Sequence, residues 1–211
     1  QYVAVGSGNG DVFLFRSGDG SRVWRAFAEG QARKIVWSAD DQYLYAGSGD
    51  GRLYKLRASD GSAAWATAPT IWACPFTYGL ALSPDGNRIA AGVKTGWLTV
   101  ISATTGAVEW TFDMGGTVTW VDWSPDGNYL AAGGGGSEST SLFTRDGARL
   151  WRNVNFTQAG RFSQDGRYVM AQGGGRLTFY ALDGEIVGDI QTSISGGGQF
   201  AYLTNAGNRI V

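Results

Sequence analysis

The stretch YLYAGSGDGRLYKLRASDGSAAW, residues 43–65, decides the fold of this chain. Its short runs of apolar and aromatic residues are separated by Gly-Asp-Gly at 49–51 and by Ser-Asp-Gly at 59–61. Asp-Gly pairs readily adopt the positive φ angles that tight hairpin turns require. Together with the run that precedes it, the stretch therefore predicts four antiparallel strands: Lys34–Ser38, Tyr43–Gly47, Arg52–Arg57 and Ala63–Ala66.

The same pattern occurs five times in the 211 residues. The other copies cover residues 2–24, 88–110, 129–151 and 168–188. Short polar turns separate the copies, and they begin 45, 41, 39 and 41 residues apart, at residues 38, 83, 124, 163 and 204. Four-stranded units that repeat at this period are typical of propellers. The prediction is one all-β domain, residues 1–211: a β-propeller of four-stranded antiparallel blades, with five repeats of about 41 residues and almost no helix.

Composition excludes several classes of function. The chain contains no histidine, which removes the commonest general base and metal ligand. Its single cysteine, Cys74, can form neither an internal disulfide nor a thiolate zinc site. The net charge is −1 and the cations are scattered, so nucleic acid is not expected as a partner. No apolar run reaches the roughly 18 residues of a membrane span, so direct membrane insertion is not expected either.

A second register joins the glycine of the last turn in a copy to a tryptophan four residues later. The last copy breaks this register, because Gly184 is followed by Gly188. Tryptophan buries a large area, so a row of them is expected to dock each blade onto its neighbour. The predicted structural docking residues are Trp24, Trp65, Trp110 and Trp151, which follow Gly20, Gly61, Gly106 and Gly147.

The succession of strand, G-S-G-D-G, strand, D-G or T-G and then W resembles the PQQ-like repeat of quinoprotein-type propellers, with its tryptophan docking motif. The S-P-D-G turns resemble those of WD-repeat propellers. The resemblance implies a propeller, favours an extracytoplasmic location, and is compatible with enzymes, receptors and scaffolds alike. Quinoprotein enzymes hold their cofactor with a calcium ion, a stacked tryptophan and often a vicinal disulfide. One cysteine and five repeats depart from that pattern, so no catalytic, cofactor-binding or metal-binding residue is predicted.

One segment departs from the repeat. Residues 68–78, APTIWACPFTY, lengthen the first turn spacing to 45 residues and carry aromatic side chains between two prolines. Such a loop suits a recognition surface, and it would equally suit a plug at the mouth of the channel. By analogy with known propellers, this link, a later link and a turn share one rim. The predicted partner-binding residues on that rim are Trp72, Phe76, Tyr78, Lys94, Trp97 and Phe156.

These observations favour a non-catalytic platform that binds a protein partner or a small ligand, without a cofactor, as one part of a larger protein or assembly. Two alternatives stay open: a segment of a quinoprotein-like dehydrogenase whose active site lies outside or across this segment, and a structural repeat of a surface or filament protein. The chain ends could also complete one blade together. Because Arg209–Val211 and Tyr2–Ala4 are equivalent positions in the repeat, an open array cut from a longer propeller is favoured.

Overall fold

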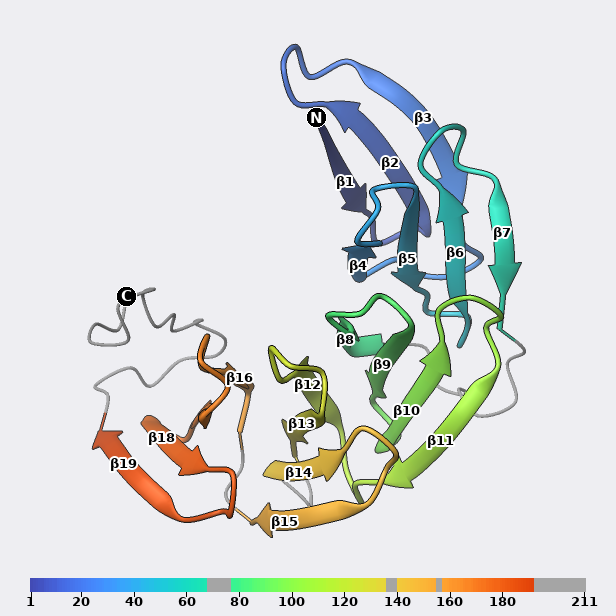
Figure 1. The fold of residues 1–211 in the computed structure, drawn as a ribbon. Coiled ribbons are helices and arrows are strands. Elements are labelled where there is room, and N and C mark those ends of the chain that lie inside the picture. Colours follow the sequence, from blue (N-terminus) through green and yellow to red (C-terminus); the bar gives the residue numbers. More distant parts are fainter. Residues whose placement is uncertain (68–76, 136–139, 155–156, 192–211) are drawn as a thin grey trace.

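The computed structural model describes residues 1–67, 77–135, 140–154 and 157–191. Within these residues the chain forms nineteen strands in five antiparallel sheets (Figure 1). This part of the chain has no helix, and hence none that could cross a membrane. The sheets follow one another along the sequence and are numbered I to V.

Every sheet is a meander in which consecutive strands pair. Sheet I has three strands: β1 (Tyr2–Gly6), β2 (Asp11–Arg16) and β3 (Arg22–Phe27). Sheet II has β4 (Lys34–Trp37), β5 (Tyr43–Gly47), β6 (Leu53–Arg57) and β7 (Ala63–Ala66). Sheet III has β8 (Thr77–Leu82), β9 (Arg88–Val93), β10 (Trp97–Ser102) and β11 (Val108–Asp113). Sheets IV and V have β12 (Val118–Trp123), β13 (Tyr129–Gly134), β14 (Thr140–Thr144), β15 (Arg149–Asn153), β16 (Ala159–Phe162), β17 (Tyr168–Gly173), β18 (Arg176–Ala181) and β19 (Ile186–Gln191).

The second repeat forms the four strands that its sequence predicts, with bounds that differ by at most one residue. The turns between them use the predicted glycines, since Gly51 has a φ of 83° and Gly61 a φ of 75°. Both angles lie in the left-handed region that glycine enters at little cost. The all-β class and the antiparallel pairing are therefore confirmed.

A separate core fills the space between each pair of neighbouring sheets. Between sheets I and II, Val12 and Leu14 of β2 pack with Leu44 and Leu56. Because side chains alternate along a strand, each of sheets II to IV gives one face to the core before it and the other to the core after it. Leu44 thus faces sheet I, while its neighbour Tyr45 belongs to the core shared with sheet III. The first strands β4, β8, β12 and β16 pack one against the next along the inside of the array (Figure 1).

The five sheets form an open arc, with sheets I and V at its two ends (Figure 1). Among the described strands β1 pairs with β2 alone, so sheet I has three strands where each other sheet has four. Residues 201–211, which the closure of a blade would involve, lie outside the described residues. The number of blades in the ring and the assignment of one domain therefore stay predictions.

Candidate functional site

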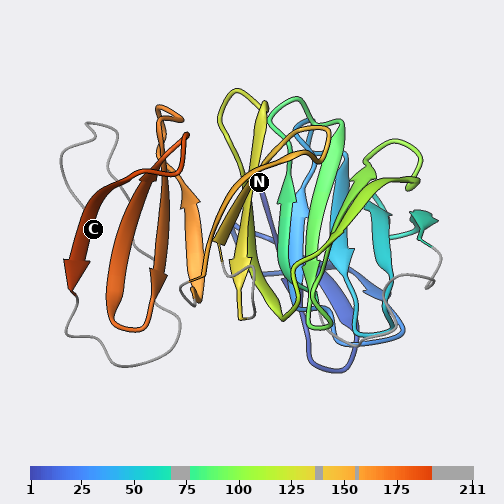
Figure 2. The same cartoon turned by 90° about the horizontal axis from the view of Figure 1, so that it is seen from below.

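The connections between strands lie at two opposite rims of the array (Figure 2). One of them, the link rim, combines the links that lead to the next sheet with one turn of each sheet. This turn joins the second and third strands in sheets II to V, and β1 and β2 in sheet I. Backbone hydrogen bonds tie the two together: Gly49 N–H donates to the oxygen of Gln31, and Gly135 N–H to that of Thr117, each over 2.9 Å. The other rim, the turn rim, carries the remaining turns. Side chains from links and turns therefore meet on the link rim.

Tyr78 lies on the link rim at the start of β8. The pairing of β8 with β9 shifts between Thr77 and Gly79, so Tyr78 is the extra residue of a β-bulge, a feature that redirects a side chain. The residue is half-buried, and the guanidinium carbon of Arg33 lies 5.7 Å from the centre of its ring. That distance fits a cation–π contact. Because Arg33 belongs to the preceding link, between sheets I and II, this contact joins the edges of sheets II and III.

Lys94 and Trp97 lie at the same end of sheet III. Lys94 is exposed in the turn between β9 and β10, and its backbone oxygen accepts a hydrogen bond of 3.0 Å from Thr117 Oγ1 in the next link. Trp97, the first residue of β10, is half-buried and packs on the core between sheets II and III. The side chain of Lys94 is thus exposed at the surface, whereas part of Trp97 packs on the core between sheets II and III.

The other predicted rim residues, Trp72, Phe76 and Phe156, lie outside the described residues. The two interpretations of the aromatic link, a recognition loop or a channel plug, therefore both remain open for residues 68–76. The described part of the candidate surface consists of Tyr78, Lys94 and Trp97 together with Arg33.

Each predicted docking tryptophan lies against the glycine of the last turn in the following sheet. A Cβ added to that glycine would lie 2.8 Å from an indole carbon at three of the four contacts and 3.1 Å at the fourth. All four glycines have positive φ, between 75° and 93°. Only glycine fits both requirements without strain. The pairs are Trp24 on Gly61, Trp65 on Gly106, Trp110 on Gly147 and Trp151 on Gly184.

The indole N–H groups of these four tryptophans differ in their hydrogen bonds. Three donate to a backbone oxygen of the same turn, namely Trp24 to Ala58 (2.8 Å), Trp110 to Arg145 (3.1 Å) and Trp151 to Leu182 (3.0 Å). The fourth, Trp65 Nε1, is buried without a hydrogen-bond partner among the described residues. The equivalent oxygen there, that of Ala103, accepts instead from Lys55 Nζ at 2.9 Å and from the hydroxyl of Tyr45 at 3.4 Å.

Carboxylates on the turn rim are held by their own turns. In four turns a serine hydroxyl donates to the aspartate two residues later over 2.5 or 2.6 Å. Each of these aspartates, Asp40, Asp85, Asp126 and Asp165, also accepts a backbone N–H. Hydrogen bonds to the ionised form lower the pKa of all four, to about 2 at Asp85 and Asp165. These groups shape the turns and are poorly suited to acid–base chemistry at neutral pH.

One carboxylate that the sequence did not single out has a different environment. Asp122 of β12 accepts the backbone N–H of Phe162 in β16 over 2.7 Å, which joins the inner strands of sheets IV and V. Burial raises the pKa of Asp122 to about 6, although the hydrogen bond opposes the shift. The described residues contain no group of three or more side chains that could hold a metal ion. Asp122 is therefore a titratable contact between sheets IV and V, with a hydrogen bond from the backbone of the neighbouring sheet.

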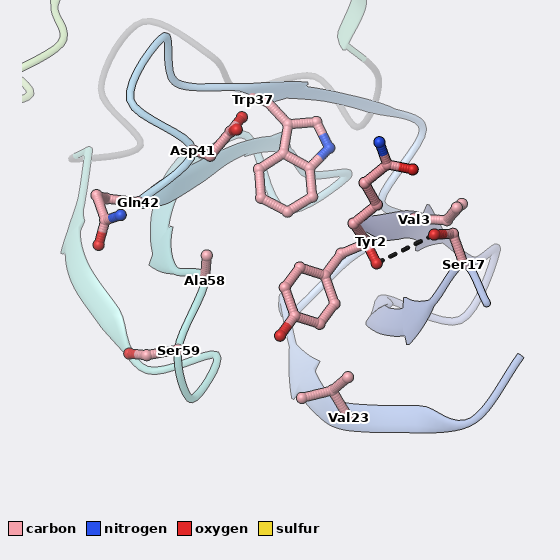
Figure 3. Close-up of a pocket in the computed structure, with 10 residues that line it drawn as sticks. Tyr2, Val3, Ser17, Val23, Trp37, Asp41, Gln42, Ala58 and Ser59 are labelled. Carbon is pink, nitrogen blue, oxygen red and sulfur yellow. Dashed lines mark hydrogen bonds between the residues drawn. The ribbon is translucent and has the colours of Figure 1, made fainter. Parts of the chain in front are cut away.

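A cavity of about 820 Å³ lies on the turn rim between sheets I and II (Figure 3). Figure 3 shows Tyr2 and Trp37 among residues from the turns of both sheets. Asp41 is the single acidic residue in the lining, so the lining provides no pair of carboxylates. The sequence pattern did not reveal this cavity, although it gave one signal: the first copy starts with residues equivalent to a second strand, and among the described strands β1 pairs with β2 alone.

Comparisons with known proteins agree on the fold. A family model described as "Outer membrane protein assembly factor BamB" matches residues 8–181. A chain in the "Crystal Structure of Mitotic Checkpoint Complex" superposes with a TM-score of 0.85 at 18% identity, covering 99% of this chain and 67% of that one. At that identity the likeness shows the fold alone, and no curated protein matches the sequence. Together the two matches support a β-propeller of PQQ-like and WD-like repeats.

Proposed function

The chain belongs to the family of PQQ-like β-propellers whose model is described as "Outer membrane protein assembly factor BamB", and from this premise we propose that it is a non-catalytic platform that binds a protein partner at the link rim. Propellers host enzymes as well as scaffolds, so the fold alone does not select between them. The choice rests on the residues of the two rims.

The observation that carries the proposal is the grouping of side chains at one end of sheet III. Tyr78 at the bulge, Lys94 in the next turn and Trp97 at the start of β10 belong to three adjacent strand ends, and Arg33 reaches Tyr78 from the neighbouring link. Tyrosine, tryptophan and arginine are the residue types that most often dominate protein interfaces. A partner with an acidic rim and an apolar centre would complement this surface.

The turn rim supports a non-catalytic assignment. Four of its aspartates accept hydrogen bonds from their own turns, and these bonds lower their pKa values. A general acid or base works best with a pKa near the operating pH, which is far above the value of about 2 for Asp85 and Asp165. Asp122, with a pKa of about 6, uses its carboxylate to hold Phe162 N–H within the sheet array.

Site-specific photo-crosslinking tests the choice of rim. A photoreactive phenylalanine placed at Lys94 should trap a discrete protein partner in cells that produce the chain. The matched control position is Thr104, which is exposed in the same sheet but on the turn rim. An adduct at position 104 without one at position 94 would show that the partner uses the other rim.

The partner identified by crosslinking can then be used to test the contribution of the aromatic link, residues 68–78. Changing Trp72→Ala together with Phe76→Ala should weaken binding by at least about 2 kcal/mol, the scale of interface hot spots, and leave the melting temperature nearly unchanged. A large drop in melting temperature would instead identify the link as a plug. A dye-reduction assay on the purified chain with added pyrroloquinoline quinone, calcium and an alcohol tests the alternative. Reduction of the dye would show that the chain acts as a dehydrogenase and not as a non-catalytic platform.

A further inference from the structure

Sheet V has a cavity of about 400 Å³ on the face that it turns toward sheet IV. Its lining comes from β17, β18 and β19 and from the link that leads to β16, and it includes Thr157, Ala171, Arg176, Thr178, Ile186 and Asp189. Ala171 also belongs to the core between sheets IV and V, which identifies the face. The volume lies within the range of about 300–1,000 Å³ that is typical of sites for small molecules.

A short turn and an exposed side chain leave this space open at the link rim. The turn between β17 and β18 has two residues, Gly174 and Gly175, whereas the equivalent turns of sheets I, II and III have four, five and three. Both glycines have positive φ, 58° and 75°, as a two-residue hairpin turn requires. Arg176, the first residue of β18, is equivalent to Trp97 of β10. Trp97 packs on a core, whereas the side chain of Arg176 is 60% exposed.

Thr178 is smaller than the residue that fills the same place in sheet II. It pairs with Ala171 as Tyr54 pairs with Ala46. Tyr54 packs in the core between sheets I and II, whereas Thr178 lines the cavity. Sheets IV and V both have four strands. The space therefore results from the size of side chains and of one turn, within two complete sheets.

A charged pair presents hydrogen-bond donors and acceptors side by side in this cavity. Arg176 Nε donates to Asp189 Oδ1 over 3.1 Å, and its Nη2 donates to Oδ2 of the same carboxylate. A guanidinium has five N–H donors, and each carboxylate oxygen can accept more than one hydrogen bond, so both groups keep capacity for a ligand. The hydrogen bonds from Arg176 lower the pKa of Asp189, and the pair carries no net charge at neutral pH.

Two threonine hydroxyls add polar groups that other residues hold in place. Thr157 Oγ1 accepts the indole N–H of Trp120 over 3.1 Å and lies 3.0 Å from Thr140 Oγ1. Thr178 Oγ1 donates to Asp189 Oδ1 over 3.4 Å. Both lining threonines are buried, at 3% and 8% exposed, so their hydroxyls are oriented before any ligand enters.

A neutral sugar ring has the chemistry that complements this lining. Its hydroxyl groups both donate and accept hydrogen bonds, and its C–H groups suit the apolar surface of Ala171 and of Ile186, which is 48% exposed. We propose that the cavity binds a neutral sugar, with Arg176 and Asp189 hydrogen-bonded to adjacent hydroxyl groups of the ring. A charged ligand of either sign would meet a like charge in the pair. The site is independent of the protein-binding surface at Tyr78 and Lys94.

Titration with single sugars tests the proposal. Glucose, galactose, mannose and N-acetylglucosamine are added to the chain in turn, and NMR follows the backbone amides. At least one should bind with a dissociation constant on the order of 1 mM, the scale for a ligand of about twelve non-hydrogen atoms. The amides of Arg176, Thr178 and Asp189 should shift. Glucuronate and glucosamine, which carry opposite charges, should bind at least about 10-fold more weakly than glucose.

Two variants assign the binding to the cavity. Thr178→Tyr introduces the residue of sheet II and should weaken binding at least about 10-fold by filling the space. Arg176→Gln should weaken it as much while leaving the melting temperature nearly unchanged, because the pair is exposed. The matched control is Arg167→Gln, which breaks an exposed pair with Asp165 on the turn rim and should bind as the parent does.

Three results would overturn the proposal. The first is that none of the four neutral sugars binds at concentrations far above the expected dissociation constant. The second is tighter binding of glucuronate than of glucose, which would identify an anion site. The third is unchanged sugar binding in both Arg176→Gln and Thr178→Tyr, which would place the sugar elsewhere on the chain.

Discussion

The junction between sheets II and III and the junction between sheets IV and V share an indole on a glycine but differ in their polar contacts. At the second of these, Trp151 donates to the oxygen of Leu182 over 3.0 Å, and Asp122 accepts Phe162 N–H on the inner side. At the junction between sheets II and III, the indole N–H of Trp65 is buried without a partner among the described residues. The equivalent acceptor, the oxygen of Ala103, accepts a hydrogen bond from Lys55 instead.

This difference separates what the repeat requires from what each junction adds. The indole–glycine contact is present at all four junctions, which points to shape as the common element. The hydrogen bond of the indole is present at three and is replaced at one, so it adjusts the stability of a junction that packing already specifies. Because burial lowers the pKa of Lys55 and raises that of Asp122, the two junctions should respond differently to pH.

Truncating the indoles should have the largest effect. Trp151→Ala is expected to cost roughly 3–5 kcal/mol in the free energy of unfolding, as large core truncations do. Trp65→Ala should cost about 1 kcal/mol less, because no indole hydrogen bond is lost there. Urea denaturation of both variants measures the difference. Phe27→Ala, at a side chain that is 62% exposed, serves as the control and should change little. A larger cost for Trp65 than for Trp151 would contradict the comparison.

Asp122, at the junction between sheets IV and V, should make the free energy of unfolding depend measurably on pH. Its folded pKa of about 6 lies above the unfolded value of 3.8, so the folded state binds the proton more tightly. Stability should therefore rise as the pH falls from 7 to 4, by up to about 3 kcal/mol from this group. Asp122→Asn should remove that rise and be the more stable protein at pH 7.

The acid limb provides the internal control for that measurement. Asp85 and Asp165 have folded pKa values of about 2, below their unfolded value, so the stability that they contribute is lost as the pH falls below about 4. This loss should be the same in the parent chain and in Asp122→Asn. A parent whose stability is flat between pH 4 and pH 7 would show that the carboxylate of Asp122 is not buried as described.

Removing the amine of Lys55, at the junction between sheets II and III, should have the smallest effect on stability. Lys55 lies over the rings of Tyr43 and Tyr45, and burial lowers the pKa of its amine. Lys55→Met keeps the aliphatic chain and removes one of the two donors to the oxygen of Ala103, so that the indole of Trp65 can donate there beside the hydroxyl of Tyr45. The lost and gained hydrogen bonds should nearly cancel, leaving a change under about 1 kcal/mol. A cost above about 2 kcal/mol, measured by urea denaturation, would mean that Trp65 does not take over the oxygen.

The repeat made most of the fold predictable. Asp-Gly turns at a fixed period mark the strand ends, so the strands of the second copy are correct to within one residue. The spacing of Gly20 and Trp24 identified the tryptophans, but not that each lies on the glycine of the next sheet. Lys55 on the oxygen of Ala103 could not be predicted, because it joins residues 48 apart through one side-chain conformation.

The candidate site was less predictable than the fold. The sequence located Tyr78 and Lys94 on a common rim only by analogy, and the β-bulge that positions Tyr78 leaves no mark in the pattern of apolar residues. The cavity at Tyr2 and Trp37 lies beside β1, which pairs with β2 alone among the described strands. Sequence motifs mark residues that are present, so they do not indicate where a neighbouring strand is lacking.

A comparison of two glycines tests most directly whether indole–glycine contacts hold the sheets together. Gly61 and Gly20 have nearly the same φ, 75° and 70°, but only Gly61 carries an indole, 2.8 Å from the position of an added Cβ. Alanine at either site meets the same backbone strain, so the strain cancels in the difference between the two variants. The free energy of unfolding of Gly61→Ala should be lower than that of Gly20→Ala by about 1–3 kcal/mol, the usual cost of overpacking. Equal values for the two variants would contradict the account.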